Sequence, residues 1–390
     1  MISVEEALAE LFALVDPLPS QSVSLRQANG RILAKNATAL RDQPPFAASA
    51  MDGYAVNGAA IAPRKTFKVI GEAAAGHRWH GTVGQDEALR IFTGAPLPNG
   101  TDHMIIQENV ARSGDEITLD DSANDNAYVR PAGADFKAGD TITAPRLLRP
   151  SDIALLASMN IPQVAVTRRP SVAIIATGDE LVQPGETPAD DQIIASNSYG
   201  LAALVEDLGA QARLLPIARD TISSLELAFD LAADADLIVT IGGASVGDHD
   251  LVGQVAQDKG MARSFYKVAM RPGKPLMAGK LGQAAMIGLP GNPVSAMVCG
   301  HVFIAPVIRK MLGQGQFPAS RESAPLAAAI SENGPREHYM RARIDAHGVT
   351  VFDRQDSALL TVLADANCLT VRPIHDPARK AGDMIEIIRI

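Results

Sequence analysis

The stretch that decides how this chain folds runs from Leu237 to Ser295 and contains three loops bent by glycine and proline. It reads Leu237-Ile-Val-Thr-Ile-Gly-Gly-Ala-Ser-Val-Gly-Asp-His-Asp250, then Lys267-Val-Ala-Met-Arg-Pro-Gly-Lys-Pro275, then Gly288-Leu-Pro-Gly-Asn-Pro-Val-Ser295. The β-branched run before the first loop predicts a buried strand that ends in a turn. Because the N–H groups and the serine of such a turn can bind phosphate, the stretch indicates an anion site.

The loops carry charges of both signs. The second loop contains three cations, Lys267, Arg271 and Lys274. The first is followed by two carboxylates, Asp248 and Asp250. Cations alone would indicate a binding site for an anion. Carboxylates beside them indicate an anion held with a metal ion, since Mg²⁺ usually bridges a carboxylate and a substrate phosphate. The alternatives are a solvated acidic turn and a solvated basic surface. Pro272-Gly273 bends the chain between two of the cations, which favours an oxyanion contact.

Composition limits the possible classes of function. The chain has 390 residues, of which 47% are hydrophobic, enough for several domains with their own cores. A net charge of −9 argues against a general nucleic-acid binder, which would carry a basic surface. The two cysteines, Cys299 and Cys368, are too few for a disulfide framework and indicate buried, inert thiols in a reducing cytosol.

Neither a signal peptide nor a membrane span is expected. Ser3 and Glu6 form a capping box before apolar residues at helical spacing, so the N-terminus carries acids where a signal carries bases. The apolar run 288–308 is interrupted by Pro290 and Pro293. We therefore expect a soluble, cytoplasmic protein.

The chain changes character several times, which predicts a multidomain protein of α/β and β class. Residues 1–40 and 140–168 have helical segments and are expected to form one domain, interrupted by a turn-rich β domain over 41–139. Residues 319–390 are expected to form a C-terminal β domain. Between them, residues 169–318 alternate strands with helices, which is typical of a parallel sheet covered by helices: Ser171–Ala176, Ser198–Leu208, Ala212–Ile217, Thr221–Ala232 and Leu237–Ile241.

Ligands of such sheets bind beyond the carboxyl ends of the strands. Thr177-Gly-Asp-Glu180 and Gly242-Gly243 both follow predicted strands, so they should share one cleft, and Glu180 is a candidate functional carboxylate. The alternative for Asp179 and its neighbour is a helix N-cap. For Asp220, capping of the helix from Thr221 is the favoured interpretation.

Other loops also have plain structural explanations. Asn292 and Pro293 suit the start of a helix, whose amides would then be offered to an anion. The glycine loop 242–247 lacks the Lys-Ser/Thr ending of a Walker loop. The Asp-Gly turn at Asp52 is compatible with an ordinary hairpin.

Taken together, the motifs resemble the MoeA/gephyrin family of molybdopterin molybdenumtransferases, nearly from end to end. The resemblance rests on the three loops above and on further strings in the family's order: Ser49-Ala-Met-Asp-Gly-Tyr-Ala-Val56, Gly71-Glu-Ala-Ala-Ala-Gly76, Thr93-Gly-Ala-Pro-Leu-Pro-Asn-Gly100, Thr177-Gly-Asp-Glu-Leu-Val182 and Ser196-Asn-Ser198. Ile241 and Ala244 stand where serine and valine are common, Arg271 where some members carry lysine, and Asp356 where glycine is frequent.

The resemblance implies an enzyme that inserts molybdenum from molybdate into adenylylated molybdopterin, with Mg²⁺, and releases AMP. It implies a homodimer of four domains: an elongated helix-containing linker domain, an inserted small β domain, a molybdopterin-binding α/β domain with a parallel-rich sheet, and a C-terminal β-barrel-like domain. The cleft would be shared between subunits. Substrate would come from a molybdopterin adenylyltransferase and the product would pass to molybdoenzymes, with no role for nucleic acid or membrane.

The resemblance also implies the site residues. The catalytic positions are Asp52, Asp135, Glu180, Asp220, Asp250, Lys267 and Arg271, of which Glu180, Asp220 and Asp250 would hold the metal. The substrate-binding positions are Thr93, Gly242, Gly243, Ser245, Gly247, Lys274, Pro290, Gly291, Asn292, Pro293 and Ser357. Asp52 and Asp135 would come from the partner subunit.

Two alternatives remain at this stage. The related adenylyltransferase is a single-domain protein similar to residues 169–315, so the β insert and the C-terminal domain argue against it. A non-catalytic, pterin-binding scaffold is the other, although the sequence carries no added receptor-binding linker.

Overall fold

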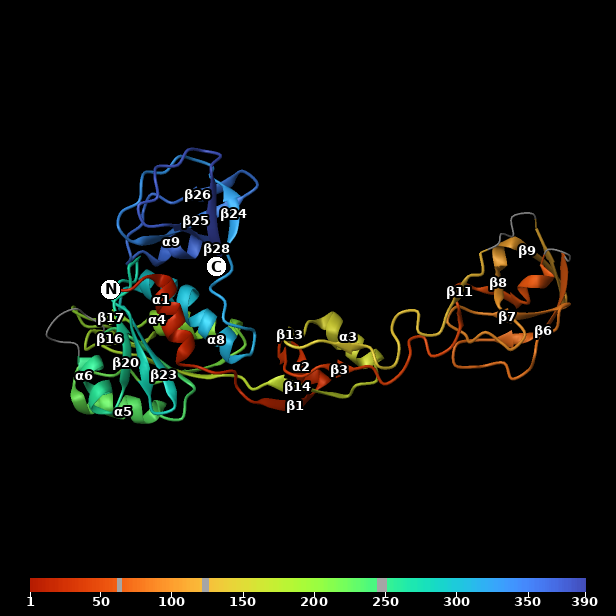
Figure 1. Ribbon diagram of the computed structural model, residues 1–390, viewed down its shortest axis with the longest axis horizontal. Coiled ribbons are helices and arrows are strands. Elements are labelled where there is room, and N and C mark those ends of the chain that lie inside the picture. Colours follow the sequence, from red (N-terminus) through yellow and green to blue (C-terminus); the bar gives the residue numbers. More distant parts are fainter. Residues whose placement is uncertain (62–64, 121–125, 244–250) are drawn as a thin grey trace. The chain divides into compact units, whose positions relative to one another are not determined.

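Figure 1 shows a computed structural model of the chain, which describes residues 1–61, 65–120, 126–243 and 251–390. The chain divides into two compact units. One comprises Met1–Gln21, Gly30–Ala34 and Val166–Ile390, and the other comprises Ser22–Asn29 and Lys35–Ala165. We describe each unit by itself.

A six-stranded sheet forms the centre of the first unit, in the order β18-β15-β19-β23-β22-β20. The first four strands run parallel, β22 is antiparallel to its neighbours on both sides, and the edge strand β20 therefore runs in the same direction as the first four. The sheet is thus parallel-rich, as the sequence predicts. Its strands are β15 (Ser171–Ala176), β18 (Gln211–Leu214), β19 (Leu237–Ile241), β20 (Ala262–Tyr266), β22 (Met277–Leu281) and β23 (Ala284–Leu289).

Helices cover both faces of this sheet because its central strands are apolar on both sides. Val172 and Ile174 of β15 belong to one core cluster, and Ala173 and Ile175 belong to another, as the two-residue period of a strand requires. The first cluster includes residues of α1, α4, α7 and α8, and the second includes residues of α5 and α6. These helices are α1 (Val4–Ala13), α4 (Asn197–Asp207), α5 (Ile222–Ala232), α6 (Leu251–Asp258), α7 (Pro293–Cys299) and α8 (Ala305–Met311).

Helices α7 and α8 are joined by a π-helical turn, Gly300–Ile304, into one apolar stretch. This stretch, Pro293–Met311, is the one helix of the described residues that is long and apolar enough to cross a membrane. Because 78% of it is buried inside the unit, its apolar character is explained by the core.

Helix α1 packs in the core of the α/β unit, whereas the sequence placed residues 1–40 with 140–168. Its capping box is formed as predicted, with Ser3 Oγ accepting from the Glu6 N–H and Glu6 Oε2 accepting from the Ser3 N–H. Its apolar face includes Leu11, which is 1% exposed and lies in the same cluster as Phe303. The periodicity predicted the helix and its buried face, but not which core that face would join.

The second unit contains a six-stranded sheet in the order β8-β5-β7-β6-β10-β9, where the sequence predicted an inserted β domain. Phe67 and Ile117 fill one of its cores and Leu89 fills another. The strands are β5 (Gly53–Val56), β6 (Thr66–Ala73), β7 (Glu87–Ile91), β8 (His103–Ile106), β9 (Val110–Ser113) and β10 (Glu116–Leu119), with short 3-10 helices η1 (Gly58–Ala60) and η2 (Gln107–Asn109).

Shorter elements lie elsewhere between residues 20 and 167, some of them in segments of the first unit. Helix α2 (Leu25–Ala28) packs against α3 (Pro150–Ser158). A four-stranded sheet has the order β1 (Ser20–Ser24), β14 (Gln163–Thr167), β2 (Ile32–Leu33) and β13 (Arg146–Leu147). Two strand pairs are β3 (Ala37–Thr38) with β12 (Thr141–Ile142), and β4 (Ala48–Ser49) with β11 (Val129–Arg130).

The C-terminal residues form a sheet in the order β21-β25-β27-β28-β24, with β26 paired to β25. Strand β21 comes from the cationic loop, and it places Arg271 opposite His338 of β25. The loop between β20 and β22 is therefore tied to the C-terminal sheet. The elements are β21 (Met270–Arg271), β24 (Glu322–Pro325), β25 (Glu337–Asp345), β26 (Gly348–Val351), α9 (Leu360–Asp365), β27 (Cys368–Arg372) and β28 (Met384–Arg389).

We expect Leu11→Ala to reduce the stability of the α/β unit by about 2–5 kcal/mol, because it opens a cavity under α1. Native-state hydrogen exchange of the β15 and β19 amides would measure the change. Ala9→Ser, on the exposed face of the same helix, is the control. Unchanged exchange in Leu11→Ala would contradict the docking of α1 in this core.

Candidate functional site

The strand order creates a crevice at the carboxyl ends of β15 and β19. The chain leaves β15 for β18 on one side and returns through α5 to β19 on the other side. At such a switch point the loops diverge and leave room for a ligand. The loops concerned are 177–181 after β15 and the one that begins at Gly242 after β19.

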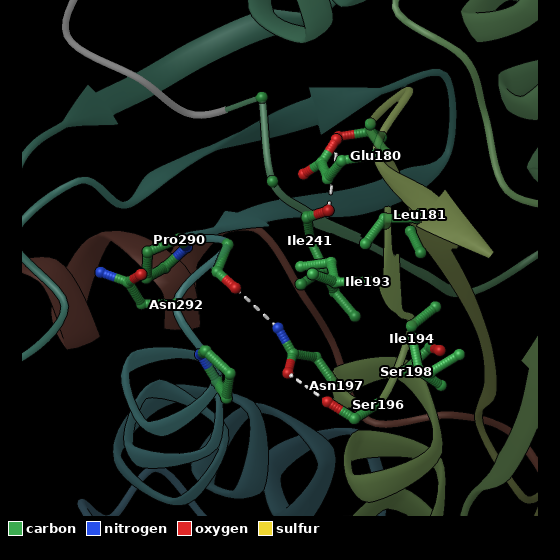
Figure 2. Close-up of a pocket in the computed structure, with 18 of the residues that line it drawn as sticks. Glu180, Leu181, Ile193, Ile194, Ser196, Asn197, Ser198, Ile241, Pro290 and Asn292 are labelled. Carbon is green, nitrogen blue, oxygen red and sulfur yellow. Dashed lines mark hydrogen bonds between the residues drawn. The ribbon is translucent and has the colours of Figure 1, made fainter. Parts of the chain in front are cut away.

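A pocket of about 920 Å³ lies at this crevice. Figure 2 shows it in close-up, with Pro290 and Asn292 on one side and Glu180, Leu181, Ile194 and Ser198 on the other. The predicted site residues in its wall are Glu180, Asp220, Gly242, Gly243, Pro290, Gly291, Asn292 and Pro293. Segments far apart in the sequence therefore meet in one cavity.

Close packing between the two loops explains the glycines after β19. Gly242 has φ +93°, and a Cβ there would lie 2.7 Å from the Thr177 carbonyl oxygen. Gly243 has φ +66°, and its Cβ would lie 2.2 Å from Cγ2 of Val252. Only glycine combines these backbone angles with so little space. The predicted Ser245, Gly247, Asp248 and Asp250 lie outside the described residues.

Hydrogen bonds hold the two carboxylate-bearing loops together. The Asp220 N–H donates to Asp179 Oδ1 at 3.2 Å, and Arg219 Nη1 donates to the Asp179 and Leu181 carbonyl oxygens at 2.9 and 3.2 Å. The Asp179 turn continues into a short strand, so its carboxylate fastens the neighbouring loop instead of capping a helix. Glu180 and Asp220 both line the pocket as a result.

The favoured capping role for Asp220 is wrong. Thr221 is the N-cap of α5, and its hydroxyl oxygen accepts from the Ser224 N–H at 3.3 Å. The Asp220 carboxylate, one residue earlier, is therefore not needed to cap α5. It lines the pocket with Glu180.

These two carboxylates suit a magnesium ion. Mg²⁺ usually takes one or two protein carboxylates and completes its shell with waters and phosphate oxygens. Among the residues that the structure describes, no group of three or more His, Cys, Asp or Glu side chains is placed to hold a metal by itself. Glu180 and Asp220 could supply two such carboxylates.

The helix start predicted at Asn292 and Pro293 is confirmed. Asn292 is the N-cap residue of α7 and Pro293 its first residue. Neighbouring segments bind this end of the helix: Asn197 Nδ2 donates to the Gly291 carbonyl oxygen at 2.7 Å, and the Val294 N–H donates to the Ser357 carbonyl oxygen at 3.0 Å. Ser357 therefore reaches the pocket region through its backbone, and the next residue, Ala358, lines the wall.

The three predicted cations precede Pro275, which is a residue of the pocket wall. Lys267, Arg271 and Lys274 are not in its wall as the described residues delimit it, although Pro275 is. Lys267 Nζ lies 5.1 Å from the centroid of the Tyr266 ring. The loop is anchored at Gly273, where a Cβ would lie 2.6 Å from Cys299 Sγ of α7. Burial raises the pKa of the Cys299 thiol, as expected for an inert buried cysteine.

Arg271 also affects the C-terminal sheet. His338 is buried, and burial followed by the nearby Arg271 guanidinium lowers its pKa to about 4. The imidazole is therefore neutral at pH 7 and adds no charge to the cationic loop.

In the second unit, Asp52 and Thr93 form one local constellation. Asp52 Oδ1 accepts from Thr93 Oγ1 at 2.6 Å and from the Thr93 N–H at 2.8 Å, and these bonds lower the pKa of Asp52. Arg90 also holds this loop, because its Nη1 donates to the Gly53 carbonyl oxygen at 3.1 Å. Asp135 is exposed, and its N–H donates to the Gln43 carbonyl oxygen at 2.9 Å.

An apolar wall of the pocket was missed by sequence reasoning. Leu181 of β16 (Leu181–Val182) and both residues of β17 (Ile193–Ile194) line the cavity, and Ile193 is 58% exposed. This short strand follows the polar run Asp190-Asp191-Gln192, and the sequence analysis assigned no element there. The signal that could have indicated this wall was the pair Ile193-Ile194, which lacks the flanking apolar residues of a core strand.

We expect Thr93→Val to raise the pKa of Asp52 towards its ordinary value, because the hydroxyl donor that stabilises the carboxylate is lost. The depressed pKa favours the folded state above the unfolded-state pKa, and this contribution is lost as the pH falls through the folded-state pKa. In the variant this contribution should be smaller, and its loss should be complete at a higher pH. Carboxyl titration by NMR would measure it. Thr101→Val, which removes a hydroxyl bonded to the Pro98 carbonyl, should leave the Asp52 titration unchanged.

Comparisons with protein families match almost the whole chain. Residues 2–160 match the MoeA N-terminal region (domain I and II), residues 173–310 a probable molybdopterin binding domain, and residues 323–390 the MoeA C-terminal region (domain IV). The pocket residues from Thr177 to Pro293 all lie in the second of these matches.

Individual proteins are similar over their full length. A molybdopterin molybdenumtransferase of Haemophilus influenzae is 36% identical, with 99% of this chain and 98% of that relative covered. One of Nostoc sp. is 35% identical, with 100% and 94% covered. Among solved structures, a molybdopterin biosynthesis MoeA protein of Pyrococcus horikoshii is 26% identical with a TM-score of 0.86, and 100% of each chain is covered.

Proposed function

Because the chain belongs to the MoeA family of molybdopterin molybdenumtransferases, we propose that it inserts molybdenum from molybdate into adenylylated molybdopterin and releases AMP. The observation that carries the proposal is the pocket at the switch point between β15 and β19. Two carboxylates, a glycine turn and a helix N-terminus border this pocket. These are the groups that a phosphoric anhydride bound with a metal ion requires.

The roles of the residues follow from their chemistry. Glu180 and Asp220, with Asp250 as a further ligand, would hold Mg²⁺, which polarises a bound phosphate. The amides of the glycine loop, including Gly242, Gly243, Ser245 and Gly247, would bind phosphate oxygens. Lys267, Arg271 and Lys274 would offset the charge of molybdate and phosphate together, which would account for three cations in the loop that leads to Pro275 of the pocket wall.

The other predicted residues fall outside this pocket and are assigned by family membership. We propose a homodimer in which Asp52, Thr93 and Asp135 of one copy complete the cleft of the other, with Ser357 contributing from the C-terminal domain. The four domains would span 41–139, 169–318, 319–390 and the linker domain predicted over 1–40 with 140–168, of which α1 packs in the α/β core. The protein would act in the cytoplasm, between the adenylyltransferase that supplies its substrate and the molybdoenzymes that receive its product.

The adenylyltransferase alternative is not favoured. The N-terminal and C-terminal MoeA regions extend on both sides of the molybdopterin-binding domain and match relatives that are named molybdenumtransferases. The length of these two regions also argues against a chain that consists only of a pterin-binding domain.

The proposal is tested by AMP release from adenylylated molybdopterin, with and without molybdate and Mg²⁺. We expect release to depend on both and to fall at least about 100-fold in Glu180→Ala, because a metal-ligating carboxylate is lost. Glu186→Ala, an acid outside the pocket wall, is the matched control. Substrate binding without AMP release by the unaltered chain would refute the proposed activity and indicate a scaffold.

Complementation tests the shared cleft. Asp52→Ala and Glu180→Ala chains should each be inactive alone. If each cleft takes Asp52 from one copy and Glu180 from the other, randomly mixed dimers should regain roughly a quarter of the unaltered activity, because half are heterodimers with one intact cleft. Mixing should be done under conditions that allow exchange of subunits, with light scattering to follow the dimer. No recovery after confirmed exchange would place both residues in one copy's cleft.

A further inference from the structure

Three segments of the second unit meet at one end of its six-stranded sheet. Strand β5 lies between β7 and β8 and is antiparallel to both. Its first residue, Gly53, therefore pairs with the last residues of both neighbours, Ile91 and Ile106. The bend that holds Asp52 before β5 thus lies beside the chain that leaves β7 towards Thr93 and the chain that leaves β8.

The guanidinium of Arg90, on β7, holds these segments together. Nη1 donates to the Gly53 carbonyl oxygen at 3.1 Å, and Nη2 donates to Gln107 Oε1, after β8, at 2.6 Å. The guanidinium carbon also lies 5.1 Å from the centroid of the Tyr54 ring and 4.7 Å from that of Phe92. Hydrogen bonds at both terminal nitrogens and two aromatic rings fix the orientation of the guanidinium.

The groups that Arg90 binds are the groups that hold Asp52. Gly53 is the next residue, and the Gln107 N–H donates to the Asp52 carbonyl oxygen at 3.1 Å. Thr93, three residues after Arg90, donates to Asp52 Oδ1 through both its hydroxyl and its N–H. Within the described part of the chain, Asp52 Oδ2 accepts no hydrogen bond. One carboxylate oxygen is therefore held by the protein, and the other is left for a ligand.

We propose that Arg90 is a positioning residue for the reaction, which keeps the Asp52–Thr93 pair in place without touching the substrate. The proposal rests on the proposed function, in which this pair of one copy completes the cleft of the other. A displacement of about 1 Å at a reacting group can cost about 100-fold in rate, so a carboxylate supplied by a second copy needs a fixed orientation. Asp52 lies in a bend outside the strand, and its orientation depends on these contacts.

The geometry requires an arginine rather than a positive charge alone. The two acceptors, on Gly53 and Gln107, belong to different segments, and a planar guanidinium reaches both at once. A lysine keeps the charge but offers a single nitrogen, so Arg90→Lys separates the two roles. The alternative is that Arg90 balances the charge of Glu72, which stands opposite it in β6.

The first measurement is the titration of the Asp52 carboxyl by NMR in the whole chain. The Thr93 bonds and, as a smaller cause, the Arg90 cation hold the pKa of Asp52 below its ordinary value. We expect Arg90→Lys to raise this pKa although it keeps the charge, because the Thr93 bonds loosen once the segments separate. Arg112→Lys, on the edge strand β9, removes a bond from Nε to the Gly114 carbonyl oxygen and should leave the titration unchanged.

An unchanged Asp52 titration in Arg90→Lys would overturn the proposal. If the pKa then rises only in Arg90→Met, Arg90 acts on Asp52 through its charge and not by holding the segments.

The second measurement is kcat/KM for AMP release from adenylylated molybdopterin. We expect Arg90→Lys to lower it about tenfold, and by less than about twofold when Asp52→Asn is already present, because a residue that acts through another has no separate effect. In a Glu72→Gln background the full loss should remain. Equal losses with and without Asp52→Asn would indicate general destabilisation and overturn the proposal, and a loss that disappears with Glu72→Gln would assign Arg90 to the charge of Glu72.

Failure of this inference and failure of the proposed activity give different results. If the unaltered chain releases no AMP but Arg90→Lys shifts the Asp52 titration, the activity falls and the holding of Asp52 by Arg90 stands. If the unaltered chain releases AMP and Arg90→Lys leaves kcat/KM unchanged, the activity stands and the positioning role falls.

Discussion

The site depends on the close approach of the turn after β19 to the end of β15. Gly242 packs so tightly against the Thr177 carbonyl that no side chain fits between them. This contact fixes the relative position of the two loops at the switch point, and with it the distance between the glycine turn and the carboxylates of Glu180 and Asp220. Because parallel pairing of β15 with β19 brings their carboxyl ends together, the crevice is a consequence of topology.

Two further segments contact helix α7. The cationic loop packs Gly273 against Cys299, and the loop at Ser357 accepts a hydrogen bond from the Val294 N–H. Helix α7 therefore contacts the C-terminal domain near its N-terminus and the cationic loop at its last residue, and it packs in the core of the α/β sheet. The burial of Pro293–Met311 makes this connection rigid, since a helix packed in the core cannot move independently of the sheet.

Local patterns predicted the elements of this region well. The β-branched run before Gly242 is β19, the helix from Asn292 and Pro293 begins where expected, and Ser3 forms its capping box with Glu6. Each of these signals acts within a few residues, so the chain around it carries all the information needed. Patterns failed where a choice between distant partners was involved. The apolar face of α1 joined the α/β core, and Thr221 took the cap that was assigned to Asp220.

The sequence by itself determined the alternation of strands and helices, the helix starts and the family strings, because propensity, capping and turn geometry are local. Only the tertiary structure decided which of the candidate residues share a cavity. It placed Glu180 and Asp220 in one wall, did not place Lys267, Arg271 or Lys274 in the wall that the described residues form, and added Ile193 and Ile194, which no motif had indicated. The physical reason is that a pocket is made by the register and order of strands distant in the sequence, and the pattern within any one segment does not encode the segment it will face.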